Sequence, residues 1–325
     1  MLNIGIIGCG IVSGYGHLPA ATHSPDWKLA AICDTNPQRL EAIHKTYPKP
    51  AAYTDHRQLL EHPQLDAVVV ATHAHTHATI TLDAFNNGLH VLCEKPMAAS
   101  LDECRQMVDA ADRAQRLLAI NFNGRSALIY RQIKSLIDTG LTGPIRVVRI
   151  VYDWSAHQWQ PPQRLDTFMR NGGPVVDSAV HFFEAAAWFT GQDVQTVEAR
   201  GVTLPPYDNP QHAIAVCTLT GGAIALIEAG WIYTKSTKDQ AQLFQIDVIG
   251  DQGVISYDNT SGRLRTYGSD ATTDEVFQDS DKNFPHVYER FARSIEAGHL
   301  IDLASGHDGL KATNAAYQAL ASAKR

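Results

Sequence analysis

Short apolar runs alternate with longer amphipathic stretches over roughly the first 120 residues of the chain. The apolar runs lie at 3–7, 29–33, 67–71, 90–93 and 117–122, and the amphipathic stretches at 38–46, 76–87 and 101–116. Continuous apolar runs that end at turn residues are typical of strands buried on both faces, whereas the longer stretches have helical spacing. The pattern predicts a doubly wound α/β domain over residues 1–122, with a parallel sheet covered by helices.

The pattern changes after about residue 123, where strands begin to dominate. We expect strands at 145–152, 195–202, 213–219, 223–232, 243–249, 254–258 and 263–267, and helices at 128–138, 175–189, 285–297 and 307–323. The turn Thr220-Gly221-Gly222 predicts a hairpin, and hairpin strands are antiparallel. Residues 123–325 are therefore predicted to form an α+β domain with a large, mostly antiparallel, open sheet.

A glycine turn follows the first apolar run directly and opens a helix. Gly8 permits a tight turn, and Gly10 lets the backbone approach a pyrophosphate that the helix start at Ile11 and Val12 would stabilise. Asp34 ends the second predicted strand, where a carboxylate can accept both ribose hydroxyls of NAD. Such turns also occur for packing alone, but the strand, the helix and the acid agree here. The sequence predicts a Rossmann dinucleotide-binding domain.

The residues after Asp34 bear on the choice between NAD and NADP. Thr35 and Asn36 offer no positive charge to a 2′-phosphate, and we expect Arg39 to lie one helical turn further on. The Asp34 carboxylate would also repel a phosphate. NAD is the predicted cofactor, with NADP as the alternative because some sites of this kind accept both.

Three further residues are candidates for chemistry. Lys95 follows another predicted strand, and ligands of open α/β sheets bind outside the carboxyl ends of the strands. A lysine at a strand end is by itself usually solvated. Asp177 and His181 are spaced to share one helix face, a spacing that is also common in helices with no catalytic role.

These residues occur within a series of motifs. The motifs are Gly8-x-Gly10, the segment GLHVLCEKP at 88–96, Gly172-Gly173-x-x-x-Asp177-x-x-x-His181, HLPA at 17–20, NFN at 121–123 with Arg125, and DGLK at 308–311. In this order, and over essentially the whole chain, they resemble the glucose–fructose oxidoreductase/inositol dehydrogenase family (Gfo/Idh/MocA).

The resemblance implies a two-domain NAD(P)-dependent oxidoreductase that transfers hydride between nicotinamide and a CH–OH group of a sugar, sugar derivative or cyclic polyol. The family's catalytic residues match Lys95, Asp177 and His181. His181 would be the acid/base because histidine titrates near neutral pH. Lys95 would orient the hydroxyl and stabilise alkoxide charge, and Asp177 would support them. A homodimer or homotetramer built through the open sheet is also implied.

The loop after the predicted strand at 67–71 departs from the family, which commonly has a proline where this chain has Thr72-His73. The alternating histidines His73, His75 and His77 also invite a metal interpretation. No second set of ligands accompanies them, and we expect no metal there. The resemblance places a histidine like His77 beside the cofactor. Thr72, His73, His77 and Glu94 are accordingly predicted cofactor-binding residues, together with Lys95.

Aromatic and polar residues gather between 152 and 171. Aromatic faces beside hydroxyl-binding groups suit a carbohydrate ring, so Trp154 and Arg164 are predicted substrate residues, together with Arg125. Trp159 belongs to the same segment. The alternative is that Trp154 and Trp159 are core or subunit-contact residues.

A second departure from the family is Pro174, which stands in place of a third glycine and is acceptable in the first turn of a helix.

Composition limits the partners of the chain. A hydrophobic content of 44% is typical of a globular protein, and the net charge of −7 argues against nucleic acid or an anionic membrane surface as a partner. No apolar run reaches the roughly 18 residues of a membrane span. The five cysteines are odd in number and have no CxxC spacing, which suits a reducing cytoplasm better than a disulfide framework.

Three other functions share the predicted fold. One is a redox-neutral enzyme that cleaves glycosides through transient oxidation, and another exchanges hydride between two sugars on a tightly held cofactor. The third is a non-enzymatic NAD(P)-binding regulator. A regulator has no need to keep Lys95, Asp177 and His181 together, so their presence favours an enzyme.

Overall fold

The computed structural model describes residues 1–156, 162–277 and 282–325. Contacts divide the chain into two compact units, Met1–Ser126 with Lys282–Leu310, and Ala127–Asp281 with Lys311–Arg325. The predicted boundary after residue 122 leaves the segment 282–310 in the second domain, whereas the structure includes it in the first unit. The reason is α11 (Phe284–Ala297), which contributes Phe284, Tyr288 and Phe291 to the core of the first unit.

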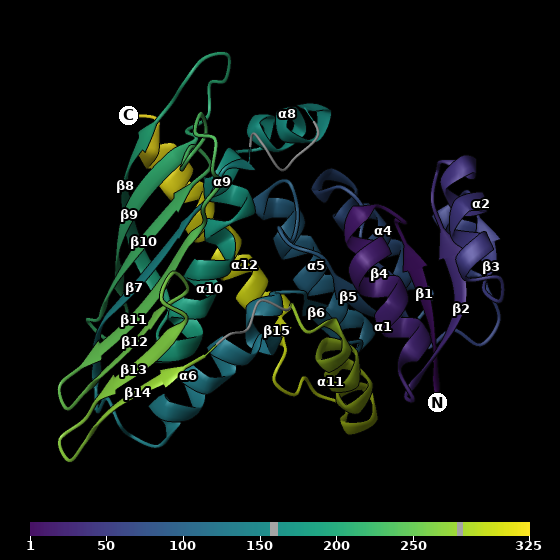
Figure 1. Ribbon diagram of the computed structural model, residues 1–325. Helices are drawn as coiled ribbons and strands as arrows, with labels where there is room; N and C mark the ends of the chain where they lie inside the picture. The colour runs from purple at the N-terminus through teal and green to yellow at the C-terminus, as the bar shows by residue number, and fades with distance from the viewer. Residues whose placement is uncertain (157–161, 278–281) are drawn as a thin grey trace. The chain divides into compact units, whose positions relative to one another are not determined.

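The first unit contains a seven-stranded sheet with the order β15-β6-β5-β4-β1-β2-β3 (Figure 1). Its strands are β1 (Leu2–Ile7), β2 (Trp27–Cys33), β3 (Ala51–Tyr53), β4 (Ala67–Val70), β5 (His90–Cys93), β6 (Leu118–Ile120) and β15 (Ala304–Ser305). All neighbours pair in parallel except β15 with β6. The predicted doubly wound domain is confirmed, and its strand order reverses at β1, where dinucleotides bind in such sheets.

The predicted helices of the first unit are present, together with short helical elements that were not predicted. They are α1 (Leu18–His23), α2 (Pro37–Thr46), α3 (His56–Leu60), α4 (Ala74–Asn86), α5 (Leu101–Ala114) and α11, with a π-helix η1 (Ser13–His17) and a 3-10 helix η2 (Asn123–Ser126). Ser100 caps α5 by accepting a hydrogen bond from the backbone N–H of Glu103. Trp27 stacks on Phe291 with ring centroids 5.6 Å apart. Burial of each such aromatic side chain stabilises the fold by about 1.5–3 kcal/mol.

The second unit contains an eight-stranded sheet with the order β14-β13-β12-β11-β7-β10-β9-β8. Its strands are β7 (Ile145–Asp153), β8 (Val194–Val202), β9 (His212–Leu219), β10 (Ile224–Gly230), β11 (Leu243–Gly250), β12 (Val254–Asp258), β13 (Arg263–Tyr267) and β14 (Thr272–Val276). β9 and β10 form the predicted antiparallel hairpin, and only β7 and β10 pair in parallel among the described strands of this sheet. The mostly antiparallel sheet is therefore confirmed.

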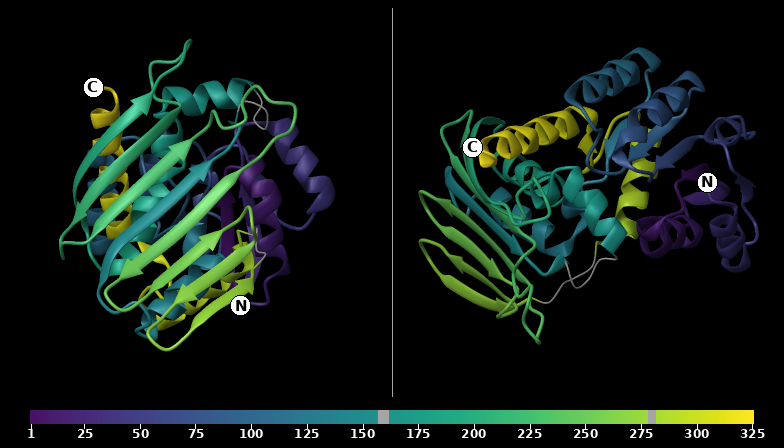
Figure 2. Two further views of the ribbon diagram at one scale, coloured as in Figure 1. Left: turned by 60° about the vertical axis from the view of Figure 1, so that its left-hand side comes forward. Right: turned by 90° about the horizontal axis from the view of Figure 1, so that it is seen from above.

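Helices cover one face of this sheet and leave the other open (Figures 1 and 2). The helices are α6 (Leu128–Asp138), α8 (Pro162–Arg170), α9 (Gly173–Asp177), α10 (Ala179–Thr190) and α12 (Gly306–Ala323), the last of which starts in the first unit. Side chains on β9 alternate: Ala213 and Ala215 are buried, whereas Ile214 and Val216 are 41% and 47% exposed. Among the described residues, no helix is long and apolar enough to cross a membrane.

The helix predicted over 175–189 is interrupted. α9 ends at Asp177, Ser178 has φ −98° and ψ −52°, and α10 begins at Ala179. The backbone N–H of His181 donates to the Ser178 carbonyl at 3.1 Å instead of reaching one residue further back. Asp177 therefore closes one helix and His181 lies in the first turn of the next. The expectation of one continuous helix is wrong.

Candidate active site

The turn after β1 has the shape that a phosphate-binding turn requires. Gly8 has φ +95°, and a Cβ there would lie 2.4 Å from the carbonyl oxygen of Ala71, so only glycine fits. A Cβ on Gly10 would meet nothing within 4 Å, which leaves its backbone open to a ligand. The Ser13 hydroxyl donates to the Gly8 carbonyl at 2.5 Å and holds the turn. The helix starting at Ile11 presents its first N–H groups here, and such groups suit a pyrophosphate.

Asp34 is buried and tied to the same turn. Its Oδ2 accepts a hydrogen bond from the backbone N–H of Cys9, and its Oδ1 accepts one from Asn36, both at 2.9 Å. Arg39 Nη1 lies 2.9 Å from Oδ2. The expectation that Arg39 lies one helical turn further on is wrong, because Asn36 caps α2 and Arg39 falls in its first turn. A cation therefore stands beside the predicted ribose carboxylate.

Glu94 is buried in a polar network at the end of β5. Its Oε1 accepts a hydrogen bond from Asn121 Nδ2 at 2.6 Å and lies 3.0 Å from His17 Nε2, while its Oε2 accepts one from the backbone N–H of Lys95 at 3.3 Å. Burial raises the pKa of this carboxyl, but the bonds from His17 and Asn121 and the Lys95 charge outweigh it and lower the pKa to about 2. Glu94, predicted to bind the cofactor, thus fixes the backbone that presents Lys95. His17 and its partner Tyr288, 3.1 Å away, were not predicted as site residues.

His77 joins the turns that follow β4 and β5. Its Nδ1 lies 3.1 Å from the carbonyl oxygen of Pro96, and its Nε2 lies 3.2 Å from that of Thr72. The side chain is buried, and burial lowers its pKa, which favours the neutral ring. His73 is exposed at the N-cap position of α4, with its ring stacked on His75 at a centroid distance of 5.9 Å.

Lys95 is half-buried directly after β5. The carboxyl ends of parallel strands share one edge of the sheet, so Lys95, the turn at Gly8 and Asp34 all follow strands at that edge. Because the hydrogen bond to Glu94 fixes its backbone, the position of the lysine is set by a buried group. An ammonium group at this edge can orient and polarise a substrate oxygen.

Arg125, predicted to bind substrate, belongs to the first unit and contacts its C-terminal segment. Its Nη1 donates to the carbonyl oxygen of Leu303 at 3.3 Å, and its Nη2 lies 3.4 Å from Asp308 Oδ2. The guanidinium of Arg125 therefore binds the segment that leads into α12 and the first turn of that helix. A substrate role for Arg125 stays a prediction.

In the second unit, Asp177 and His181 are half-buried around the helix interruption. The hydroxyl of Ser178 between them accepts a hydrogen bond from Trp231 Nε1 at 3.2 Å. Trp231 also meets the half-buried Trp154 edge-to-face, with ring centroids 6.3 Å apart. Trp231 was not predicted, although its position directly after β10 and a glycine is a signal that the sequence carries.

Arg164 lies on α8 with its guanidinium 5.1 Å from the centre of the Phe168 ring. Phe168 in turn packs against Trp231, with ring centroids 6.2 Å apart. The predicted substrate residues Trp154 and Arg164 are thus brought into one aromatic cluster of the second unit, whereas Trp159 lies outside the described residues.

Comparisons with known proteins agree with the geometry. The model of the oxidoreductase family with an NAD-binding Rossmann fold (GFO_IDH_MocA) matches residues 2–122, and that of the GFO/IDH/MocA C-terminal domain matches residues 130–256. The chain belongs to the GFO/IDH/MocA oxidoreductase family. The recognised family and the expected class of enzyme, an oxidoreductase with an NAD-binding domain, are confirmed.

Known relatives cover from about four fifths of the chain to nearly all of it. Myo-inositol 2-dehydrogenase from Thermotoga maritima is 28% identical over 79% of this chain and 75% of its own. Inositol 2-dehydrogenase/D-chiro-inositol 3-dehydrogenase from Shouchella clausii is 28% identical over 95% of this chain and 84% of its own. The crystal structure of a probable dehydrogenase from Thermotoga maritima superposes with a TM-score of 0.83 at 26% identity, covering 99% of this chain and 96% of the other.

Proposed function

We propose that the chain oxidises a CH–OH group of a sugar, sugar derivative or cyclic polyol, with NAD as the hydride acceptor. One observation carries the proposal: the open glycine turn, Asp34 and a lysine fixed by a buried carboxylate all follow strands at the carboxyl edge of one parallel sheet. Gly8, Gly10, Ile11, Val12 and Asp34 would hold the adenosine and pyrophosphate. The inositol dehydrogenases among the relatives support the substrate class.

Lys95, Asp177 and His181 are the proposed catalytic residues. His181 takes the hydroxyl proton as the carbon gives up its hydride, and it returns that proton in the reverse direction. Lys95 holds the substrate oxygen and stabilises its developing negative charge. Asp177, at the end of the preceding helix, orients the substrate or the imidazole. Trp154, Arg164 and Arg125 are proposed to shape substrate choice.

The reaction is tested by following NADH absorbance with purified protein, NAD or NADP, and a panel of aldoses, uronates, amino sugars and inositols. We expect NADH with one substrate class, and we expect Lys95→Ala and His181→Ala to abolish it. Lys45→Ala and His23→Ala are matched controls, because both residues are exposed. Tight NAD binding with no reduced cofactor for any substrate would contradict net oxidation and point to redox-neutral turnover or to a regulator.

The proposed enzyme is a cytoplasmic homodimer or homotetramer. Exposed apolar side chains on the open sheet face, including Ile214, Val216 and Ile224, support a subunit contact there. All five cysteines are buried free thiols, which supports a reducing compartment. Light scattering should give the mass of two or four chains, and a monomeric mass would contradict the oligomer.

A further inference from the structure

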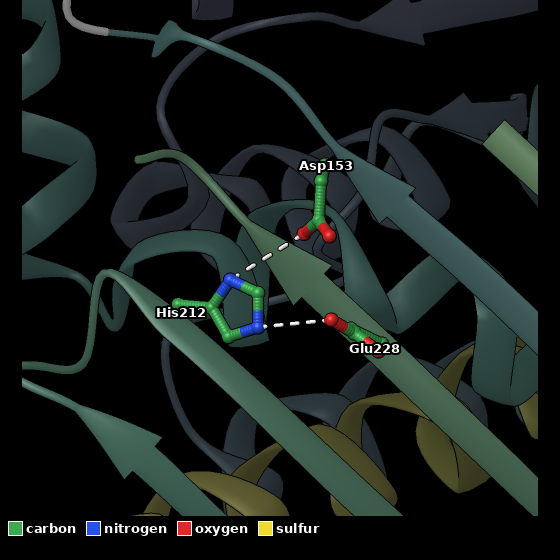
Figure 3. A group of neighbouring side chains, drawn as sticks. All are labelled: Asp153, His212 and Glu228. Atoms are coloured by element: carbon green, nitrogen blue, oxygen red, sulfur yellow. Dashed lines mark ion pairs between the residues drawn. The ribbon is translucent and has the colours of Figure 1, made fainter. Parts of the chain in front are cut away.

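Asp153, His212 and Glu228 form a cluster on the sheet of the second unit, and none of the three is among the residues proposed above to bind or react. Figure 3 shows the His212 ring between the two carboxylates. Asp153 ends β7, His212 begins β9, and Glu228 lies on β10 between these strands. One potential ligand atom from each of the three lies within 4.8 Å of the others.

Gly230 makes room for this convergence. It pairs with Asp153 across one edge of β10 and with His212 across the other. A Cβ on Gly230 would lie 2.2 Å from His212 Nδ1 and 2.3 Å from Asp153 Oδ1. The His212 ring and the Asp153 carboxylate therefore occupy the space that the side chain of any other residue at position 230 would fill.

The cluster holds negative charge that the protein satisfies only in part. His212 Nε2 lies 3.0 Å from Glu228 Oε1, whereas His212 Nδ1 lies 3.5 Å from Asp153 Oδ1. The Asp153 side chain is 5% exposed, and its Oδ1 is buried without a hydrogen bond. A buried carboxylate oxygen of this kind favours a bound cation.

We propose that Asp153, His212 and Glu228 bind one divalent transition-metal ion of the Zn²⁺ type. One imidazole with two carboxylates is a donor set that such ions accept, and the imidazole favours them over Mg²⁺. Ligands at about 2.1 Å in tetrahedral geometry stand about 3.4 Å apart. His212 would ligate through one ring nitrogen only. Its Nδ1 lies 3.5 Å from Asp153 Oδ1, which is close to that spacing, and with one atom of each residue within 4.8 Å of the others a small shift of the side chains brings all three to one ion.

In the single chain the side chains of His212 and Glu228 are 21% and 24% exposed, so an ion can enter from the open sheet face. Ile214 lies on the same face beside Glu228, so the proposed subunit contact would close over an ion that is already bound. A metal there would tie the ends of β7, β9 and β10 together. Trp154, which follows Asp153, donates its backbone N–H to the Gly230 carbonyl at 3.0 Å, so the bound ion would also steady the start of the aromatic cluster.

The proposal is tested on the full chain after chelator treatment, by titration with Zn²⁺ against a chromophoric chelator and with Co²⁺ followed by its visible absorption. We expect one equivalent per chain, with Mg²⁺ in equal amount failing to compete. Asp153→Asn, His212→Gln and Glu228→Gln should each weaken affinity by about 10-fold or more. Asp247→Asn, on the same sheet face, and His75→Gln are controls that should leave affinity unchanged.

Gly230→Ala provides a second route that keeps all three ligands, and it should also weaken binding because its Cβ enters the site. Circular dichroism of each variant establishes that it is folded. Binding below one equivalent in the wild-type chain would overturn the proposal. So would stoichiometric binding that survives His212→Gln and is lost in His75→Gln, since the metal would then sit on the histidines after β4. Neither result depends on the proposed dehydrogenase activity.

Discussion

Each of the two units buries a carboxylate beside a histidine, and the two pairs behave oppositely. Glu94 accepts hydrogen bonds from Asn121 and the Lys95 backbone and lies against His17, and its pKa falls to about 2. Asp153 lies 3.5 Å from a His212 ring nitrogen, its Oδ1 accepts no hydrogen bond, and its pKa rises to about 6. Burial opposes ionisation in both cases, so the donors around each oxygen decide the outcome.

The difference separates two uses of a buried acid. The Glu94 carboxylate has hydrogen-bond donors at both oxygens and holds the backbone before Lys95, so its removal disturbs the structure. The Asp153 carboxylate has an oxygen that accepts no hydrogen bond, and this oxygen favours an added positive charge. A buried charge with satisfied hydrogen bonds rigidifies its surroundings, whereas an unsatisfied one is costly until a cation or a proton arrives.

The largest effect is expected for Glu94→Ala. It leaves His17 and the Asn121 amide buried without their shared acceptor, and breaking a buried pair in this way costs about 3–5 kcal/mol. Urea unfolding followed by circular dichroism measures the loss. The conservative Glu94→Gln should recover part of it by keeping an oxygen acceptor. A free energy of unfolding unchanged in Glu94→Ala would show that the network contributes nothing to stability.

The second-largest effect is expected from low pH, which should lower the free energy of unfolding of the first unit. The pKa of Glu94 is lowered in the folded state, so its contribution is complete above its ordinary pKa of 4.5 and is lost as the pH falls toward 2. The shift corresponds to about 3 kcal/mol. Burial also lowers the pKa of His90 to about 4, which removes further stability between pH 6.5 and 4. Unfolding free energies at pH 7, 4.5 and 3 measure both losses, and Glu94→Gln should flatten the lower part of the curve.

Lys95→Met tests what the Glu94 network supports. The thioether keeps the length of the side chain but removes the charge, so we expect kcat/KM to fall by about 10²-fold or more with little change in stability. Steady-state NADH formation and thermal unfolding of the same preparation separate the two effects. Full activity in Lys95→Met would remove the lysine from the proposed chemistry.

Asp34 provides an intermediate case, a buried carboxylate paired with a half-exposed arginine. We expect Arg39→Ala to lower kcat/KM with NADP by about 3- to 10-fold, because Arg39 is the cation beside the ribose carboxylate. Activity with NAD should change less. The ratio of the two kcat/KM values measures the effect, and an equal loss with both cofactors would show that Arg39 does not discriminate.

No loss of stability is expected for Asp153→Asn in metal-free protein. The raised pKa of Asp153 means that its contribution is complete below its ordinary pKa of 3.8 and is lost as the pH rises through about 6. At pH 7 the neutral amide removes this penalty, so it should leave stability unchanged or raise it by up to about 3 kcal/mol, and the difference should shrink toward pH 4. Paired urea titrations check this, and a loss above about 2 kcal/mol would contradict it.

Hydrophobic periodicity alone predicted much of the fold. The structure confirms the elements at 90–93, 128–138, 254–258 and 263–267 at the predicted bounds. The pattern missed β3, α3 and β15, which are very short, and β14 and α8, which are rich in polar residues. It also did not show the interruption at Ser178, because the apolar spacing continues through it.

Some features of the candidate site were likewise predictable from the sequence, and others were not. The glycine turn and its acid were predictable because each depends on neighbours in the sequence and on a fixed relation of strand to helix. The pairing of Asp34 with Arg39 depended on where the cap of α2 places its first turn, which spacing alone does not fix. The contacts of Glu94 with His17 and Tyr288 join residues far apart in the chain, and no local pattern marks them.

The sequence by itself determined the order of the longer elements, the Rossmann domain, the family and the positions of Lys95, Asp177 and His181 in their motifs. Only the tertiary structure decided which buried acids are satisfied. Strand register brings Asp153 and His212 to either side of Gly230, and a shift of one residue would turn their side chains to the other face. Periodicity is a local property of the chain, whereas a cluster that spans three strands depends on how those strands pair.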